Sequence, residues 1–192
     1  MERLAVYCGS TAPSPEYLQL AREVGQGIAR RGMGLVYGGG RLGLMGAIAD
    51  AALLEGGEVI GVIPDALVKA EMAHRGLHRL EVVQTMHERK ARFTELSDGF
   101  VTLPGGTGTM DELWEALSWA QLGYHAKPVG LLNVGGFYDP LIAMWNRMGE
   151  IGFVRPQHRD LIIEAGDFTT LIERMESFTP TRPIIQLDRD EL

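Results

Sequence analysis

The residues best placed to do chemistry lie in one glycine-rich stretch, Pro104-Gly105-Gly106-Thr107-Gly108-Thr109-Met110-Asp111-Glu112. It follows a strand-like apolar run, residues 99–103, and opens a run with helical character, residues 113–122. Such a turn exposes backbone N–H groups beside the positive end of the helix dipole, and both favour a phosphate. Binding a phosphate needs no carboxylate, so Glu112 indicates chemistry next to one. The structural alternative is that Glu112 only complements the dipole of its helix.

A second candidate, Arg89, lies on a helix that the pattern predicts over about residues 86–97. The buried face of this helix is predicted by three apolar residues at helical spacing, Met86, Phe93 and Leu96. Arg89 lies within about 40° of the centre of that face. An unpaired buried charge is costly, so the guanidinium needs a partner, and we expect a ligand. A salt bridge to Glu112 or Glu115, or a place at the rim of the face, is the structural alternative.

Strand-like and helix-like segments alternate along the chain and predict how these residues are positioned. Apolar runs typical of strands cover residues 4–8, 34–37, 58–63, 80–83, 99–103 and 128–132. Helical patterns cover about residues 15–31, 43–54, 86–97, 113–122, 140–148 and 167–175. Residues 64–79 show no regular pattern. The alternation predicts a single-domain α/β fold, a doubly wound parallel sheet with helices on both faces.

Three loops of small residues should meet at one edge of this sheet. They are Gly9-Ser10, Gly38-Gly39-Gly40 and Pro104-Gly105-Gly106, and each leaves a strand at its carboxyl end, where ligands bind in such folds. A site of mononucleotide size is therefore predicted. We assign residues 1–178 to the nucleotide-binding catalytic domain and 179–192 to a polar C-terminal tail, in which Ile184-Ile185 is a candidate edge strand.

The composition of the chain excludes several classes of protein and of binding partner. The chain has 192 residues, 45% of them hydrophobic, which suits one sizeable core. Its net charge of -7 argues against binding nucleic acid, which needs a concentrated basic face. No apolar run approaches the ~20 residues of a membrane helix. The single cysteine, Cys8, fits a reducing compartment, and the start resembles no signal peptide, so we expect a cytoplasmic protein without membrane contact.

Two other kinds of site are weaker alternatives. Residues 38–43 match the dinucleotide fingerprint G-x-G-x-x-G, with Asp65 after the next strand, but the fingerprint normally follows the first strand and here follows the second. His74, His78 and His87 lack the glutamate-bearing helical spacing of a zinc site, and no cysteine cluster accompanies them. We therefore expect neither a metal nor a cofactor.

The motifs together resemble the LOG family, the cytokinin riboside 5′-monophosphate phosphoribohydrolases. The stretch from Pro104 to Glu112 is similar to the family signature PGGxGTxxE, and Met86-His87-Glu88-Arg89-Lys90-Ala91 also resembles the family. Further similar segments cover residues 6–10, 35–46, 59–64 and 119–123, so the resemblance spans about residues 4 to 150. Thr107, Asp111 and Phe93 stand where other residues are frequent in the family, which affects the expected base preference more than the reaction.

The resemblance implies hydrolysis of the N-glycosidic bond of an adenine-type nucleoside 5′-monophosphate, AMP included, to free base and ribose 5-phosphate. It also implies a Rossmann-like fold and a homodimer. Trp119 lies on another face of its helix than Met110, Trp114 and Leu117, which favours a homo-oligomer, although an internal neighbour could cover it instead. Arg89 and Glu112 match the catalytic pair of the family. Positions that match its nucleotide-binding residues, or belong to the three loops, are Gly9, Ser10, Gly39, Gly40, Glu71, Arg89, Lys90, Gly105, Gly106, Thr107, Gly108, Thr109, Met110 and Asp111.

Three rival functions remain open at this point. One is a salvage nucleosidase that acts on plain AMP or pyrimidine nucleotides, because the region around residues 64–80, where the base should bind, carries no motif. Another is a protein that binds a nucleotide without turnover, which the pairing of Glu112 with an inward Arg89 disfavours. The last is the dinucleotide oxidoreductase. Some relatives carry a lysine decarboxylase label, which we reject because no lysine has a pyridoxal-phosphate setting.

Overall fold

The computed structural model describes residues 1–70 and 72–184, and within them a seven-stranded parallel sheet forms the middle layer. Its strands lie in the order β4-β3-β2-β1-β5-β6-β7. Their bounds are β1 Arg3–Tyr7, β2 Gly34–Tyr37, β3 Val59–Pro64, β4 Arg79–Val83, β5 Gly99–Thr102, β6 Val129–Leu132 and β7 Ile162–Ala165. β1, β2, β3, β5 and β6 are buried over nearly all their residues, as parallel strands covered on both faces must be.

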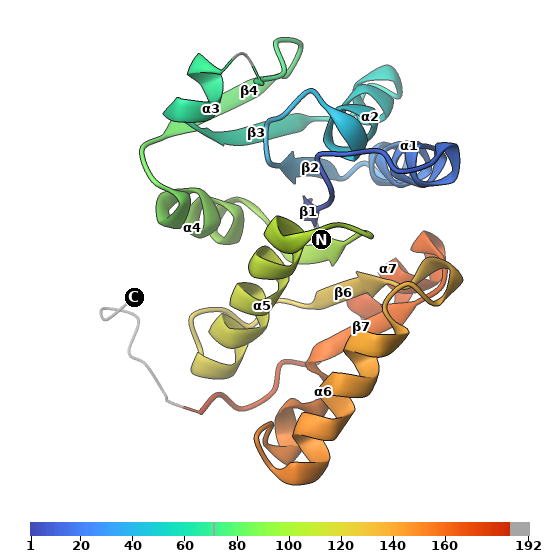
Figure 1. The fold of residues 1–192 in the computed structure, drawn as a ribbon, viewed down its shortest axis with the longest axis vertical. Coiled ribbons are helices and arrows are strands. Elements are labelled where there is room, and N and C mark those ends of the chain that lie inside the picture. The colour runs from blue at the N-terminus through green and yellow to red at the C-terminus, as the bar shows by residue number, and fades with distance from the viewer. Residues whose placement is uncertain (71, 185–192) are drawn as a thin grey trace.

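Helices cover both faces of the sheet (Figure 1). Their bounds are α1 Pro15–Arg30, α2 Gly43–Leu54, α3 Asp65–Lys69, α4 Met86–Leu96, α5 Thr107–Leu122, α6 Asp139–Ile151 and α7 Phe168–Glu176. One core packs α1, α2 and α7 on the sheet through residues such as Ala21, Ile48 and Leu171. The other core packs α4, α5 and α6 on the opposite face through residues such as Phe93, Leu113 and Trp145. The predicted doubly wound α/β fold is confirmed.

The order of the strands reverses between β1 and β5. From β1 the chain builds one half of the sheet through β2, β3 and β4, then crosses back through α4 to β5 on the other side of β1. In doubly wound folds this reversal opens a crevice at the carboxyl ends of the two strands, where ligands bind. The loops after β1 and β5 therefore flank the expected site.

The structure corrects three details of the predicted elements. α5 begins at Thr107, not at residue 113, so Thr107 to Asp111 form its first turns rather than a loop. Glycine and threonine form helices poorly, and their low propensity hid this start. α3 and β7 were not predicted, because α3 spans only one turn and β7 is a short edge strand that carries the polar Glu164.

Two further predictions concern single residues. Met86 was expected in the core, but its side chain is half-exposed, because it is the first residue of α4. Ile184 donates its backbone N–H to the carbonyl of Gln121 but belongs to no strand, and Ile185 lies outside the described residues. Within the described ranges, no helix has the length and apolar character to cross a bilayer.

Candidate active site

The start of α5 forms one wall of the site. Its N-cap, Gly106, is extended, with φ −95° and ψ −155°, and has no side chain with which to cap the first N–H groups of the helix. A Cβ added at Gly105 would lie 2.2 Å from Oγ1 of Thr109, so packing inside the protein requires that glycine. A Cβ at Gly106 or Gly108 would meet nothing within 4 Å. The helix end thus presents uncapped N–H groups next to open space, which suits a phosphate.

Backbone carbonyls near the ends of two strands bind the guanidinium of Arg89, which lies on α4. Its Nε–H donates to the carbonyl of Val62 at 3.0 Å, and Nη2 donates to the carbonyl of Gly38 at 3.2 Å. A Cβ at Gly38 would lie 2.2 Å from Nη2, so only glycine leaves room for this contact. The guanidinium also lies over the ring of Phe93, 5.3 Å from its centre, and Arg89 is buried. These contacts fix where the charge points.

The remaining side of the guanidinium faces Glu112. Nη1 of Arg89 lies 3.5 Å from Oε1 of Glu112, and the two side chains are only 10% and 11% exposed. Burial raises the pKa of Glu112 to about 7, and the negative charges of Asp111 and Glu115 act in the same direction, whereas Arg89 and Lys90 oppose it. A carboxyl with this pKa exchanges its proton near neutral pH, as a general acid or base must.

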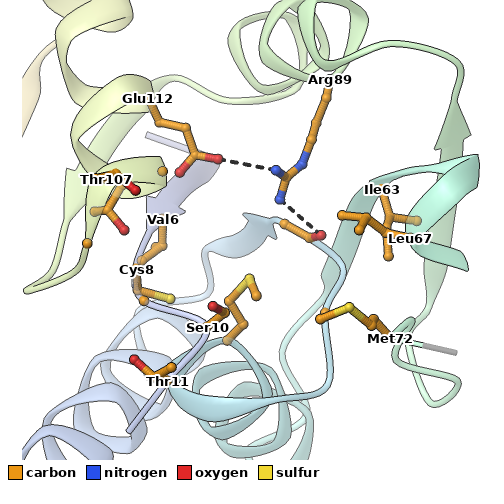
Figure 2. A pocket seen from close by; sticks show the side chains of 17 residues that line it. Val6, Cys8, Ser10, Thr11, Ile63, Leu67, Met72, Arg89, Thr107 and Glu112 are labelled. Carbon is orange, nitrogen blue, oxygen red and sulfur yellow. Dashed lines mark hydrogen bonds and ion pairs between the residues drawn. The ribbon is translucent and has the colours of Figure 1, made fainter. Parts of the chain in front are cut away.

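These groups line a cavity of about 320 Å³ at the edge of the sheet, a size typical of small-molecule sites. Figure 2 shows the hydroxyl-bearing Thr107, Ser10 and Thr11 on one side, together with Val6 and Cys8. The apolar Ile63, Leu67 and Met72 lie on the other side, with Glu112 and Arg89 above the space between the two. The described residues that line it are Val6, Cys8, Gly9, Ser10, Thr11, Gly38, Gly40, Met45, Ile63, Leu67, Met72, Arg89, Gly106, Thr107, Gly108, Thr109 and Glu112. The cavity therefore has a polar side, an apolar side and an acid–arginine pair between them.

The structure brings together many of the residues that the sequence singled out, although their roles stay predictions. Those on the cavity are Gly9, Ser10, Gly40, Arg89, Gly106, Thr107, Gly108, Thr109 and Glu112. Among the described residues, those that do not line it are Gly39, Lys90, Gly105, Met110 and Asp111. Lys90 instead pairs with Asp111 and Glu115 on α5. Glu71 lies outside the described residues.

Sequence reasoning placed the base around residues 64–80 but singled out none of the apolar residues on this side of the cavity. Leu67 lies on the unpredicted α3 and Met72 in the loop that follows it, within the segment that showed no pattern. Met45 was counted only as part of a helix and of a motif. Ile63 could have been found, because it precedes Pro64 at the end of a predicted strand.

Comparisons with known proteins settle the family. A family model described as "Possible lysine decarboxylase" matches residues 45–175. A probable cytokinin riboside 5′-monophosphate phosphoribohydrolase of Oryza sativa subsp. japonica is 46% identical over 93% of this chain and 79% of its own. The chain belongs to the LOG family. An Arabidopsis thaliana LOG protein, a cytokinin riboside 5′-monophosphate phosphoribohydrolase, is 43% identical over 93% of this chain and 84% of its own.

A solved structure shows the same fold at lower sequence similarity. The molybdenum cofactor carrier protein of Chlamydomonas reinhardtii superposes with a TM-score of 0.70 at 23% identity, over 91% of this chain and 96% of that one. The match places the LOG fold of this chain among Rossmann-like α/β structures.

Proposed function

We propose that this LOG-family protein hydrolyses the N-glycosidic bond of nucleoside 5′-monophosphates, cytokinin riboside 5′-monophosphates and AMP among them, to free base and ribose 5-phosphate. The observation that carries the proposal is a buried Glu112 paired with Arg89 in the cavity that also holds the uncapped start of α5. Relatives at 43% and 46% identity bear the name of this activity. The opposite sides of the cavity suit the opposite ends of a nucleotide.

The position of each substrate group follows from the chemistry of the lining. The phosphate binds at the N–H groups of residues 106–109, near Ser10 and Thr11. The base lies against Ile63, Leu67 and Met72 on the apolar side. The sugar then lies between them, under Glu112 and Arg89. No cofactor or metal is part of this proposal.

Cleavage of the C1′–N bond builds positive charge on the sugar, as in glycoside hydrolysis. Ionised Glu112 stabilises this charge, takes a proton from the attacking water, or does both. Arg89, fixed by the carbonyls of Gly38 and Val62, orients the substrate and balances the charge of Glu112. Because Glu112 acts in its ionised form and its pKa is about 7, kcat/KM should rise with pH through that value.

The name of the family model points to a different reaction, decarboxylation of lysine. A lysine that could form a Schiff base would have to reach the cavity, and among the described residues that line it there is none. Lys90, on the helix beside it, is held by two carboxylates. The described lining therefore gives no support to Schiff-base chemistry.

The test uses chromatography to measure the free base that the protein releases from isopentenyladenosine monophosphate, from AMP and from a pyrimidine nucleotide. Wild-type protein should release adenine-type bases, and Glu112→Gln and Arg89→Ala should each lose most of this activity while they remain folded. General-base catalysis contributes about 10²- to 10⁴-fold. Near-normal turnover in either variant would refute the assignment. AMP binding without ribose 5-phosphate would establish a binding protein instead.

We also propose that the protein is a cytoplasmic homodimer. Val82, Met86 and Tyr124 are each 44–48% exposed on β4, on α4 and just after α5, and Trp119 lies 5.8 Å from the ring of Tyr124. The homodimer follows the family resemblance, and we place these partly exposed apolar side chains at its interface. Sedimentation of wild type should give twice the mass of the 21.1 kDa chain, and Tyr124→Glu should lower it. A monomeric wild type would contradict this assembly.

A further inference from the structure

Beside the Arg89–Glu112 pair, a second ionic contact joins α4 to α5. Nζ of Lys90 lies 2.6 Å from Oε2 of Glu115 and 3.1 Å from Oδ2 of Asp111. The Lys90 side chain is only 10% exposed and that of Glu115 20%. Lys90 follows Arg89 directly in the sequence, so α4 presents two neighbouring cations to the acids of α5.

The two acids that bind Lys90 bracket Glu112 along α5. Asp111 precedes it, and Glu115 lies three residues after it, close to one helical turn. Lys90 therefore ties α4 to α5 on both sides of Glu112, while Arg89 faces Glu112 itself. Movement of α4 relative to α5 would disturb both contacts together.

Lys90 is engaged by the protein rather than directed at the cavity. Burial lowers the pKa of Lys90, but the hydrogen bonds to Glu115 and Asp111 outweigh it and raise the pKa above its ordinary value. The ammonium therefore stays charged and bound to α5. Lys90 is not among the described residues that line the cavity.

Of the two acids that bind Lys90, Glu115 is the more unusual, because part of its carboxylate has no partner among the described residues. Its second oxygen, Oε1, is buried and, within the part of the chain that the structure describes, has no hydrogen-bond partner. Such an oxygen costs stability, and a buried ion pair adds little in return. Stability alone therefore gives little reason for a glutamate here.

We propose that Lys90 and Glu115 are positioning residues, which hold Glu112 against Arg89 and set the charge around it, and that Lys90 does not bind the nucleotide. This inference rests on the proposed phosphoribohydrolase activity. It gives Lys90 a role different from the nucleotide contact that the resemblance implies.

The inference predicts opposite effects for the two partners. The charged groups that act on Glu112 are Arg89 and Lys90 from α4 and Asp111 and Glu115 from α5, and the charge of Glu112 in turn raises the pKa of Tyr7 and of Cys8 at the end of β1. The charge of Glu115 raises the pKa of Glu112 and that of Lys90 lowers it. Glu115→Gln should therefore move the acidic limb of the pH–kcat/KM profile to lower pH, and Lys90→Met should move it to higher pH.

The experiment compares wild type, Glu115→Gln, Lys90→Met and the double variant, with base release from AMP measured across pH. Lys90→Met should also lower kcat by about 10-fold to 100-fold through misplacement of Glu112, with KM near wild type. In the double variant the shifts should largely cancel. Glu95→Gln, an exposed charge change on α4, is the matched control and should leave the profile unchanged. A higher KM for Lys90→Met with an unmoved limb would overturn the inference.

Asp111→Asn covers the case in which the buried variants fail to fold. Asp111 is 61% exposed, so its replacement should leave folding intact, and it too raises the pKa of Glu112. Its acidic limb should also move to lower pH, and a limb that stays in place would overturn the inference. Failure of the proposed function looks different, because wild type itself would then release no base.

Discussion

Two glycine-rich loops meet in the cavity, Gly38-Gly39-Gly40 after β2 and Pro104 to Gly108 after β5, but their glycines have different surroundings. In the first loop an added Cβ at Gly38 would strike the guanidinium of Arg89, and one at Gly40 would strike the side chain of Met45. In the second loop Gly106 and Gly108 have open space in front of them. The protein itself fills the space beside Gly38 and Gly40, whereas the space beside Gly106 and Gly108 is open, and in the second loop it is Gly105 that is packed, against Thr109.

Each loop also helps to position one residue of the Arg89–Glu112 pair. The carbonyl of Gly38 accepts a hydrogen bond from Arg89, and the second loop begins the helix that carries Glu112. A glycine motif alone thus does not reveal a ligand site, because glycine can be required either by close packing within the protein or by the close approach of a ligand. The two kinds of glycine are told apart by whether the space that a Cβ would occupy is filled by the protein or is open.

The largest effect should come from a substitution at Gly38. Gly38→Ala should leave the fold intact, because the clashing atom is the end of a side chain that can move, but it should displace Arg89. We expect kcat for base release to fall by about 100-fold, the effect of a catalytic group misplaced by about 1 Å. Steady-state kinetics with AMP, alongside circular dichroism, would measure both consequences.

Gly34→Ala is the matched control, because Gly34 lies at the opposite end of β2. A Cβ there would meet the Arg3–Glu58 ion pair, whose side chains are 38% and 46% exposed. This pair lies at the end of the sheet away from the cavity. Its turnover should match wild type. Equal losses in the two variants would mean that strand packing, not the position of Arg89, explains the result for Gly38.

The second prediction concerns the stability cost of Glu112. The pKa of Glu112 is about 7 in the folded protein and 4.5 ordinarily, so the folded state binds its proton more tightly. The stability that this proton contributes is fully present below pH 4.5 and is lost as pH rises through 7. Glu112→Gln should therefore raise the free energy of unfolding at pH 8 by about 1–3 kcal/mol.

Urea unfolding at pH 8 and pH 4 would measure this difference, with the exposed Glu95→Gln as control. The gain should disappear at pH 4, where both forms of residue 112 are neutral. An equal gain at both pH values would show that Glu112 is not strained by its burial, and the acid–base role would lose its support.

The sequence predicted the fold well where hydrophobic pattern decides it. The buried strands from residue 4 to 8, 34 to 37 and 128 to 132 are continuous apolar runs, which few other structures accommodate. β7 was missed because one face of an edge strand accepts polar residues such as Glu164, which breaks the pattern. α5 was started too late because tertiary contacts override the weak helix propensity of glycine and threonine.

For the site, the sequence singled out the polar residues but none of the apolar ones, although it placed the base around residues 64–80. Arg89 stands out because a charge on the apolar face of a helix needs a partner, and Glu112 because it follows a glycine-rich turn that suits an anion. Leu67 and Met72 do not, because apolar residues are expected in any interior. The pairing of Lys90 with Glu115 needed the relative placement of α4 and α5, which spacing within one helix cannot supply.

The smallest effect should come from the second loop, at Gly108 in the first turn of α5. Gly108→Ala places a methyl group in open space and replaces glycine by the best helix former, so the free energy of unfolding should rise by up to about 1 kcal/mol. The same methyl group would occupy the space in which the phosphate binds, so KM for AMP should rise while kcat changes less. Ser118→Ala, at an exposed position of the same helix, controls for helix propensity and should stabilise without a change in KM. If Gly108→Ala stabilised the protein and left KM unaltered, the open space beside α5 would not be the phosphate site, and both loops would be glycine-rich for packing alone.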